Sequence, residues 1–92
     1  GAVSAGAKSL AIEYASKNIR VNTIAPGIVN TPMTANASYK KDEALLVKTL
    51  EKYPLGFGEP INVAHSCVFL LSEASSWITG TEITIDGGYS AL

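Results

Sequence analysis

The sequence predicts an α/β fold in which two parallel strands are flanked by helices. Apolar residues recur at helical spacing over residues 1–16, and residues 19–25 form a short run that is apolar on both faces. A second short strand is predicted at residues 81–85, after two more helical segments, which leaves room for a right-handed crossover. Because two strands alone leave a sheet without partners, we expect its other strands to come from elsewhere.

The composition is that of a globular chain. Of the 92 residues, 47% are hydrophobic and 16% are charged, and the net charge is −1. No basic cluster points to nucleic acid, and no apolar run reaches the roughly 18 residues that a membrane span requires. The single cysteine, Cys67, cannot form an internal disulfide, which fits a reducing compartment. We therefore expect a cytoplasmic protein that binds neither membranes nor nucleic acid.

The first helix is predicted to end near Asn18, a residue that accepts the left-handed backbone of a helix C-terminus. The sequence opens at Gly1 with no capping residue before the helical pattern, so we expect the chain to be a piece of a longer protein. The apolar stripe of this helix consists of Val3, Ala7, Leu10, Ala11 and Tyr14.

The first strand is expected to end at Pro26, because proline has no N–H to donate to a sheet. Within the strand, Asn22 is polar, and we expect its side chain to make a structural hydrogen bond. A loop follows to about residue 37. Residues 38–53 are then predicted to form one surface helix, whose apolar stripe is Leu45, Leu46, Leu50 and Tyr53.

The last third of the chain is predicted to contain a helix, the second strand and a turn. Pro60 suits the first position of a helix, which is expected to follow a linker over residues 54–58. Asp86, Gly87 and Gly88 are expected to form a structural turn. The buried stripe of the last helix is predicted to be Ala64, Cys67, Val68 and Leu71.

Four segments of the sequence form an ordered set. They are Asn18-Ile19-Arg20-Val21-Asn22-Thr23-Ile24-Ala25-Pro26-Gly27 with Thr31-Pro32-Met33, Pro54-Leu55-Gly56 with Gly58-Glu59-Pro60, Phe69-Leu70-Leu71-Ser72 with Trp77-Ile78-Thr79-Gly80, and Asp86-Gly87-Gly88. In this order they resemble the C-terminal part of the short-chain dehydrogenase/reductase family. The pattern is nearest to the 3-oxoacyl-carrier-protein reductase branch, and sugar and steroid alcohol dehydrogenases share these segments. The resemblance implies that residues 1–92 form the C-terminal portion of one Rossmann-type domain, with the last two strands of a doubly wound parallel sheet.

The resemblance also implies a nicotinamide cofactor, either NADP or NAD, at the loop after the first strand. Pro26 and Gly27 would form a wall beside the nicotinamide ring, and the backbone of Val29 would bind its carboxamide. Thr31 would reach the carboxamide or the neighbouring phosphate, and Met33 would cover the cofactor. Hydride transfer would then be the chemistry of the cofactor.

In the family, the region that follows this loop covers the substrate, and here we call residues 34–53 the lid. The residues expected near the substrate or the lid hinge are Ala35, Asn36, Leu46 and Leu50. The implied substrate is a small carbonyl or alcohol compound, and the implied assembly is a homo-oligomer, either a tetramer or a dimer.

The catalytic Tyr-x-x-x-Lys motif of the family is absent from the 92 residues and is expected upstream of Gly1. Tyr14 is interpreted as a core or interface aromatic, His65 as exposed, and Cys67 as a small core residue. No group of residues has metal-ligand spacing, so no metal is expected. Two departures concern the subfamily. The family usually has a basic residue between the Leu-Gly of the linker and the following glycine, and here Phe57 stands alone in that gap. Ile61 and Asn62 stand where the family usually has acidic residues.

The sequence is compatible with two alternatives. The chain without its proton donor would be a non-catalytic fragment that only binds or assembles. Alternatively, the protein is a family member that has lost redox chemistry and binds a nucleotide only.

Overall fold

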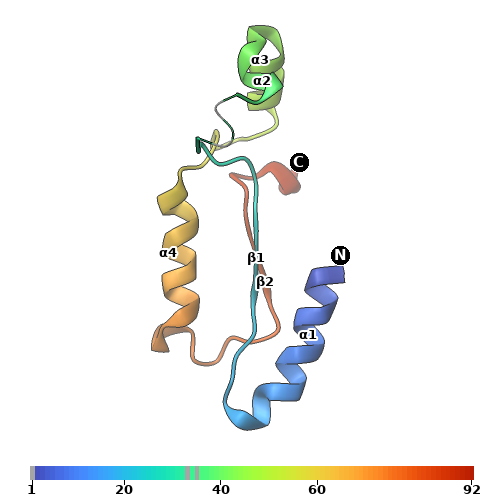
Figure 1. The fold of residues 1–92 in the computed structure, drawn as a ribbon, viewed down its shortest axis with the longest axis vertical. Coiled ribbons are helices and arrows are strands. Elements are labelled where there is room, and N and C mark those ends of the chain that lie inside the picture. The colour runs from blue at the N-terminus through green and yellow to red at the C-terminus, as the bar shows by residue number, and fades with distance from the viewer. Residues whose placement is uncertain (1, 33, 35) are drawn as a thin grey trace. The chain divides into compact units, whose positions relative to one another are not determined.

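A computed structural model describes residues 2–32, 34 and 36–92 of the chain (Figure 1). Contacts divide it into two compact units, each assembled from two stretches of sequence. The first consists of Gly1–Ala25 and His65–Thr84, and the second of Pro26–Ala64 and Ile85–Leu92. Among the described residues, no helix has the length and apolar character needed to cross a membrane.

Helix α1 (Ala2–Tyr14) continues into a short 3-10 turn, η1 (Ala15–Lys17). Asn18 then adopts the left-handed conformation with φ 58°, and its N–H donates to the Ala15 carbonyl at 3.0 Å. The predicted helix end at Asn18 is therefore confirmed. The predicted stripe is only partly buried, because Ala11 is 2% exposed whereas Val3 is 80% exposed.

Strands β1 (Thr23–Pro26) and β2 (Glu82–Ile85) form a two-stranded sheet. The Thr23 N–H donates to the Thr81 carbonyl at 2.9 Å, and the Gly27 N–H donates to the Ile85 carbonyl at 3.0 Å. Both bonds have the same offset between their residues, so the two strands are parallel, as predicted. Pro26 nevertheless belongs to β1. Thr23 and Gly27, two odd-numbered residues, donate their N–H groups toward β2. The nitrogen of the even-numbered Pro26 therefore faces away from β2, and its missing N–H removes no hydrogen bond between the strands.

Strand β1 begins later than predicted, because Asn22 pairs through its side chain. Its amide donates to the Ile78 carbonyl at 3.0 Å and accepts from the Thr81 N–H at 3.1 Å. The preceding residue, Val21, donates its N–H to the Thr79 hydroxyl at 3.1 Å. Side-chain bonds thus stand beside one backbone bond, from the Gly80 N–H to the Val21 carbonyl at 2.8 Å, and the predicted structural role of Asn22 is confirmed.

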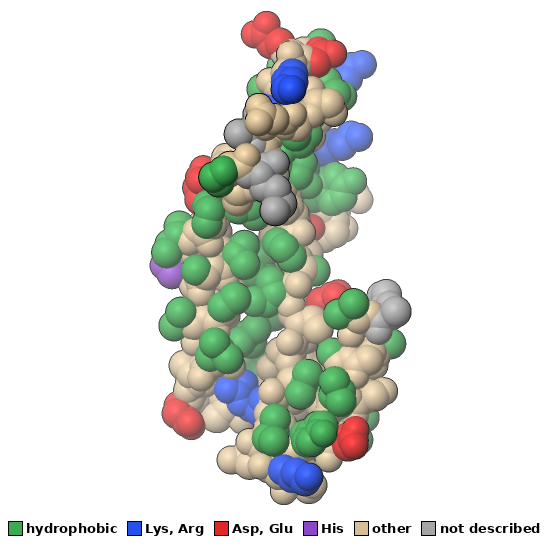
Figure 2. All heavy atoms as spheres, in the orientation of Figure 1, with side chains coloured by type: hydrophobic (Ala, Val, Ile, Leu, Met, Phe, Trp, Pro, Cys, Tyr) green, Lys and Arg blue, Asp and Glu red, His purple; other side chains and the backbone are tan. Residues whose placement is uncertain are grey.

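Helix α4 (Pro60–Leu71) begins at proline, as predicted. Its predicted buried stripe is wrong: Leu70 is the buried residue, whereas Val68 is 66% and Leu71 is 85% exposed. Figure 2 shows hydrophobic side chains on the surface of this helix. Helical spacing identifies a stripe, but a two-stranded sheet covers only a narrow strip of the helix. His65 is exposed, as predicted, and Cys67 is half-buried.

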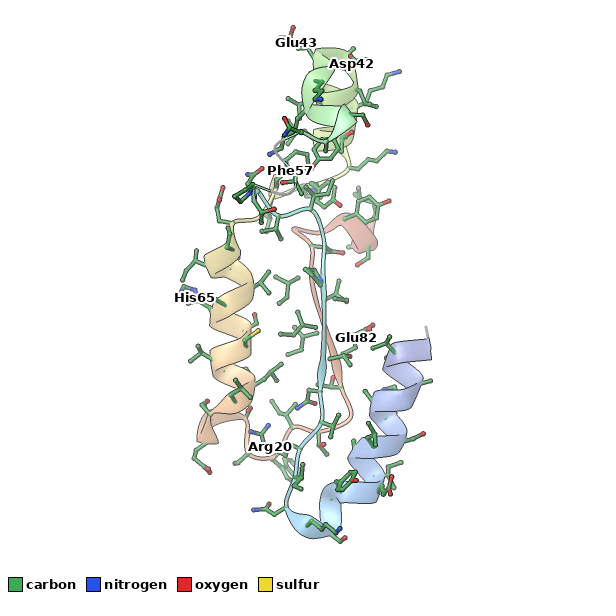
Figure 3. All side chains as sticks on the ribbon, in the orientation of Figure 1. Arg20, Asp42, Glu43, Phe57, His65 and Glu82 are labelled. Carbon is green, nitrogen blue, oxygen red and sulfur yellow. The ribbon has the colours of Figure 1, made fainter. Side chains whose placement is uncertain are left out.

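The C-terminal end of α4 is held by Arg20, whose position is labelled in Figure 3. Its guanidinium donates to three carbonyls, those of Leu70 at 2.9 Å, Ser72 at 3.2 Å and Ile78 at 3.2 Å. A cation at this place also complements the negative end of the helix dipole. Arg20 thereby ties the start of β1 to the end of α4 within the first unit. A short turn, η2 (Glu73–Ser75), follows the helix.

The single helix predicted over residues 38–53 is wrong, because Asp42 divides it. Asp42 is extended, with φ −111° and ψ 110°, between α2 (Ser38–Lys41) and α3 (Glu43–Glu51). Its carboxylate accepts from the N–H groups of Ala44 at 3.0 Å and Leu45 at 3.2 Å. Aspartate is a favoured N-cap, and here it starts a new helix rather than continuing the old one.

Candidate functional site

The loop after β1 begins at the same sheet edge at which β2 ends. The bond from the Gly27 N–H to the Ile85 carbonyl, 3.0 Å long, joins the carboxyl ends of the two strands. In open parallel sheets, ligands bind just beyond this edge. Pro26 is exposed there and Gly27 is half-buried.

Gly27 is closely enclosed on its Cα side. A Cβ atom at this position would lie 2.9 Å from Asp86 Cβ and 2.9 Å from Tyr53 Cε1. Real Cβ atoms essentially never approach other heavy atoms so closely, so a side chain at this position would force Asp86 or Tyr53 to shift. Asp86 and the ring of Tyr53 therefore pack against the Gly27 backbone on the side to which a Cβ would point.

Val29 forms a parallel β-bridge with Gly58, but the two hydrogen bonds of this bridge are made by the neighbours of Val29 and not by Val29 itself. The Gly58 N–H donates to the Ile28 carbonyl at 3.0 Å, and the Asn30 N–H donates to the Gly58 carbonyl at 2.9 Å. In a parallel ladder, the residue between two bonded neighbours turns its N–H and carbonyl to the opposite side. The Val29 N–H thus faces away from the Gly58 segment.

Thr34 closes the loop, although the sequence did not single out this residue as part of the site. Its hydroxyl accepts from the Thr31 N–H at 3.0 Å and lies 3.1 Å from both the Val29 and the Thr31 carbonyls. Its own N–H donates to the Thr31 carbonyl at 3.1 Å. No local sequence signal marked Thr34, because its role depends on how the loop folds back.

A second polar chain, which the sequence also did not reveal, joins this loop to two helices. Lys40 Nζ donates to Asn30 Oδ1 at 2.9 Å, and Asn30 Nδ2 donates to Glu59 Oε1 at 3.1 Å. Lys40 belongs to α2, and Glu59 directly precedes α4. The loop is thus tied to the lid through Lys40 and to the start of α4 through Glu59.

The predicted site residues are only partly brought together. Pro26, Gly27, Val29 and Thr31 lie on one continuous loop, and Thr31 is half-buried. Met33 and Ala35, predicted at the cofactor and at the lid hinge, lie outside the described residues. Of the other lid residues, Asn36 and Leu50 are exposed and Leu46 is half-buried.

The turn after β2 is structural, as predicted. The Asp86 carboxylate accepts from the N–H groups of Gly88 at 3.1 Å and Ser90 at 2.9 Å. Hydrogen bonding by Ser90 lowers the pKa of Asp86 below its ordinary value, against a smaller opposing effect of burial. The Leu55 N–H donates to the Gly87 carbonyl at 2.9 Å, so the turn also holds the linker before α4. A last short turn, η3 (Tyr89–Ala91), follows.

A cavity of about 300 Å³ lies beside this turn. Its walls include Ile28, Phe57, Asn62 and Asp86. Over residues 2–32, 34 and 36–92, no cluster of three or more histidine, cysteine or acidic side chains is placed to hold a metal ion.

Comparison with known proteins identifies the family. Residues 1–90 match the family model described as enoyl-(acyl carrier protein) reductase. The chain is 40% identical over 90 residues to 2,5-dichloro-2,5-cyclohexadiene-1,4-diol dehydrogenase LinX of Sphingobium indicum, which covers 97% of this chain and 34% of that protein. It is 48% identical over 82 residues to 3-oxoacyl-[acyl-carrier-protein] reductase FabG of Thermotoga maritima, covering 88% of this chain and 32% of that protein. The chain belongs to the short-chain dehydrogenase/reductase family.

Solved structures of the same family superpose closely on the chain. A 4-hydroxyisoleucine dehydrogenase mutant in complex with NADH and succinate gives a TM-score of 0.90 at 33% identity, over 99% of this chain and 37% of that one. A protein assigned as a 2-deoxy-d-gluconate 3-dehydrogenase from Agrobacterium tumefaciens, with bound NADP, gives 0.89 at 37% identity, over 98% of this chain and 36% of that one. The fold is thus a Rossmann-type α/β fold. The chain spans about a third of the length of the curated relatives it matches.

Proposed function

We propose that this chain is the cofactor-side and lid portion of an NAD(P)-dependent oxidoreductase that acts on a carbonyl/alcohol pair. The observation that carries the proposal is the Gly27 to Ile85 bond, which sets the Pro26–Gly27 backbone at the carboxyl edge of a parallel sheet. The relatives crystallised with NADH or NADP support a nicotinamide dinucleotide as the cofactor. When bound, this group supplies the hydride donor or acceptor.

The residues present fit a planar, amide-bearing ring. Pro26 is rigid and exposed, and Asp86 and Tyr53 lie on the side of Gly27 to which a side chain would project, so the other side of this backbone is the one proposed to face the ring. The Val29 N–H, directed away from Gly58, is a donor suited to a carboxamide oxygen. The Thr31 hydroxyl, one turn further on, is proposed to bind the carboxamide or a phosphate oxygen, and Met33 to cover the cofactor.

The lid, residues 34–53, is proposed to exclude water from the substrate, with Ala35, Asn36, Leu46 and Leu50 near the substrate or the hinge. Protonation of the substrate oxygen is assigned to groups outside these 92 residues, because none of the four tyrosines is followed four residues later by lysine. In the family that role belongs to the Tyr-x-x-x-Lys motif. The chain by itself is therefore expected to be inactive.

The test uses the complete gene product that contains these residues. Oxidation of NADH and of NADPH, at equal concentrations, is followed with a panel of ketones and 3-oxoacyl thioesters. Reduction of NAD⁺ and of NADP⁺ is followed with cyclic diols. Turnover with one of the two cofactors supports the proposal. Tight dinucleotide binding with no turnover on any substrate would instead favour a nucleotide-binding family member, and absence of dinucleotide binding would refute both.

The complete protein is further proposed to be a cytoplasmic homo-oligomer, either a dimer or a tetramer. Trp77 and Leu71 on the first unit are 99% and 85% exposed within the described residues, which leaves them available to the rest of the domain or to a second copy. Exposed apolar surface of this kind is typical of interaction sites. Light scattering coupled to size-exclusion chromatography measures the mass, and a monomer at micromolar concentration would contradict this assignment.

A further inference from the structure

Three aromatic rings connect the lid to the linker before α4. Tyr39 of α2 meets Phe57 edge to face, with ring centroids 5.6 Å apart and planes at 70°. Tyr53, which follows α3, meets the same Phe57 ring at 5.4 Å and 77°. Figure 3 shows Phe57 at the base of the α2–α3 pair. Phe57 is thus the shared partner through which both ends of the lid contact one point of the linker.

The same set of rings reaches the loop proposed to hold the cofactor. Tyr53 is 9% exposed, and its Cε1 atom occupies the space that a side chain at Gly27 would need. On its other side, Tyr53 stacks on Tyr89 at 4.9 Å with planes 27° apart. A shift of the Tyr53 ring therefore moves the surface that supports Gly27 from behind.

Tyr39 has two opposing effects on the position of α2 against Phe57. Its ring stabilises this docked position by packing on the Phe57 ring, and its hydroxyl destabilises it. The Tyr39 hydroxyl is buried, and it has no hydrogen-bond partner within the described part of the chain. A buried hydroxyl without a partner is unfavourable, because it loses its bonds to water. The aromatic contact with Phe57 acts in the opposite direction and favours the docked position of α2.

We propose that Phe57 is a positioning residue that couples lid closure to cofactor occupancy at Gly27. Tyr39 docks α2 on Phe57, Phe57 fixes the Tyr53 ring, and Tyr53 supports the Gly27 backbone. This inference rests on the proposed function, since it takes Gly27 to be part of a dinucleotide site. Coupling between two sites is reciprocal, so dinucleotide bound at the loop favours the docked lid to the same extent as the docked lid favours dinucleotide.

The test measures lid opening and cofactor binding separately in the complete gene product. Trypsin cleavage within the lid, at Lys40, Lys41, Lys48 and Lys52, reports the open population, and the dinucleotide affinity is measured by fluorescence titration. In the wild type, saturating dinucleotide is expected to slow this cleavage. Phe57→Leu, which keeps an apolar side chain but loses both edge contacts, is expected to reduce the protection about two- to tenfold.

Tyr39→Phe is the second variant, because it keeps the ring and removes the buried hydroxyl. It is expected to slow lid cleavage about fivefold or more even without cofactor. Tyr14→Leu is the control, since Tyr14 is a half-buried aromatic of α1 outside the three rings, and its lid protection should equal that of the wild type.

The outcomes separate the two proposals. A wild type that binds no dinucleotide refutes the proposed function. A wild type that binds it without lid protection, or a folded Phe57→Leu with full protection, overturns the coupling alone. If Phe57→Leu does not fold, the result for Tyr39→Phe decides, and unchanged or faster lid cleavage in that variant overturns the inference.

Discussion

Gly27 and Asp86 approach so closely that a methyl group on Gly27 would lie 2.9 Å from Asp86 Cβ and 3.0 Å from its Cα. These two residues follow directly on the carboxyl ends of the two parallel strands. Their contact therefore holds the loop after β1 against the turn after β2, and both Asp86 atoms belong to a turn that is fixed by its own hydrogen bonds.

Gly27→Ala is expected to destabilise the complete protein by about 1–3 kcal/mol, because neither the Asp86 backbone nor the enclosed Tyr53 ring can move away freely. The shift of the loop should also weaken dinucleotide binding. Urea unfolding and a cofactor titration measure the two effects.

Gly6→Ala is the matched control for this change, since no atom of the described part of the chain lies within 4 Å of a Cβ at Gly6. Gly6 lies inside α1, where alanine is favoured over glycine by about 0.5–1 kcal/mol. This variant should therefore be slightly more stable than the wild type, with unchanged cofactor affinity. Equal effects of the two alanines would contradict the close packing at Gly27.

Local sequence signals predicted those features that depend on a few neighbouring residues. The left-handed Asn18, the helix start at Pro60 and the turn at Asp86 each follow from the chemistry of one short segment. The parallel strands also followed from local signals, because a run that is apolar on both faces is typical of a strand covered by helices.

The features that sequence reasoning missed depend on contacts between distant or competing groups. Asp42 was compatible with a helix interior and with an N-cap, and the capping bonds to Ala44 and Leu45 decided between them. The buried side of α4 depends on what packs against it, which spacing alone does not give. Thr34 acquires its role only because the loop folds its hydroxyl back onto Val29 and Thr31.

Asp86→Asn is expected to reduce the acid sensitivity of the fold. The pKa of Asp86 is lowered from its ordinary value of 3.8, chiefly by hydrogen bonding from Ser90. A carboxyl group with a lowered pKa in the folded state stabilises the protein above its ordinary pKa, and this contribution is lost as the pH falls through the lower folded value. Between about pH 5 and pH 2, the wild type should lose unfolding free energy more steeply than the variant. Parallel pH profiles of the two proteins would refute a stabilising carboxylate at this turn.

Arg20→Lys is expected to destabilise the protein by about 1–3 kcal/mol, although the charge is kept. One ammonium group cannot reproduce the fork that bonds the carbonyls of Leu70, Ser72 and Ile78 together. Thermal unfolding measures the loss, and Lys48→Arg on the exposed face of α3 is the control for a general lysine or arginine effect. Because these bonds lie in the first unit, cofactor affinity should stay close to that of the wild type at temperatures where the variant is folded.

Thr34→Val separates the role of the loop hydroxyl from the size of its side chain. Valine has nearly the same shape but cannot accept from the Thr31 N–H or donate to the Val29 carbonyl, so the loop loses the bonds that close it. Leaving these groups without partners should weaken dinucleotide binding by about tenfold, because part of the binding free energy is then needed to order the loop. Thr34→Ser restores the hydroxyl and should recover most of the affinity.

Thr31→Val removes only the hydroxyl proposed to reach the cofactor. It should therefore raise the dissociation constant of the dinucleotide without loosening the loop, as hydrogen exchange of the Thr34 amide would show. If Thr34→Ser were as impaired as Thr34→Val, the methyl group and not the hydroxyl would be the group that holds the loop.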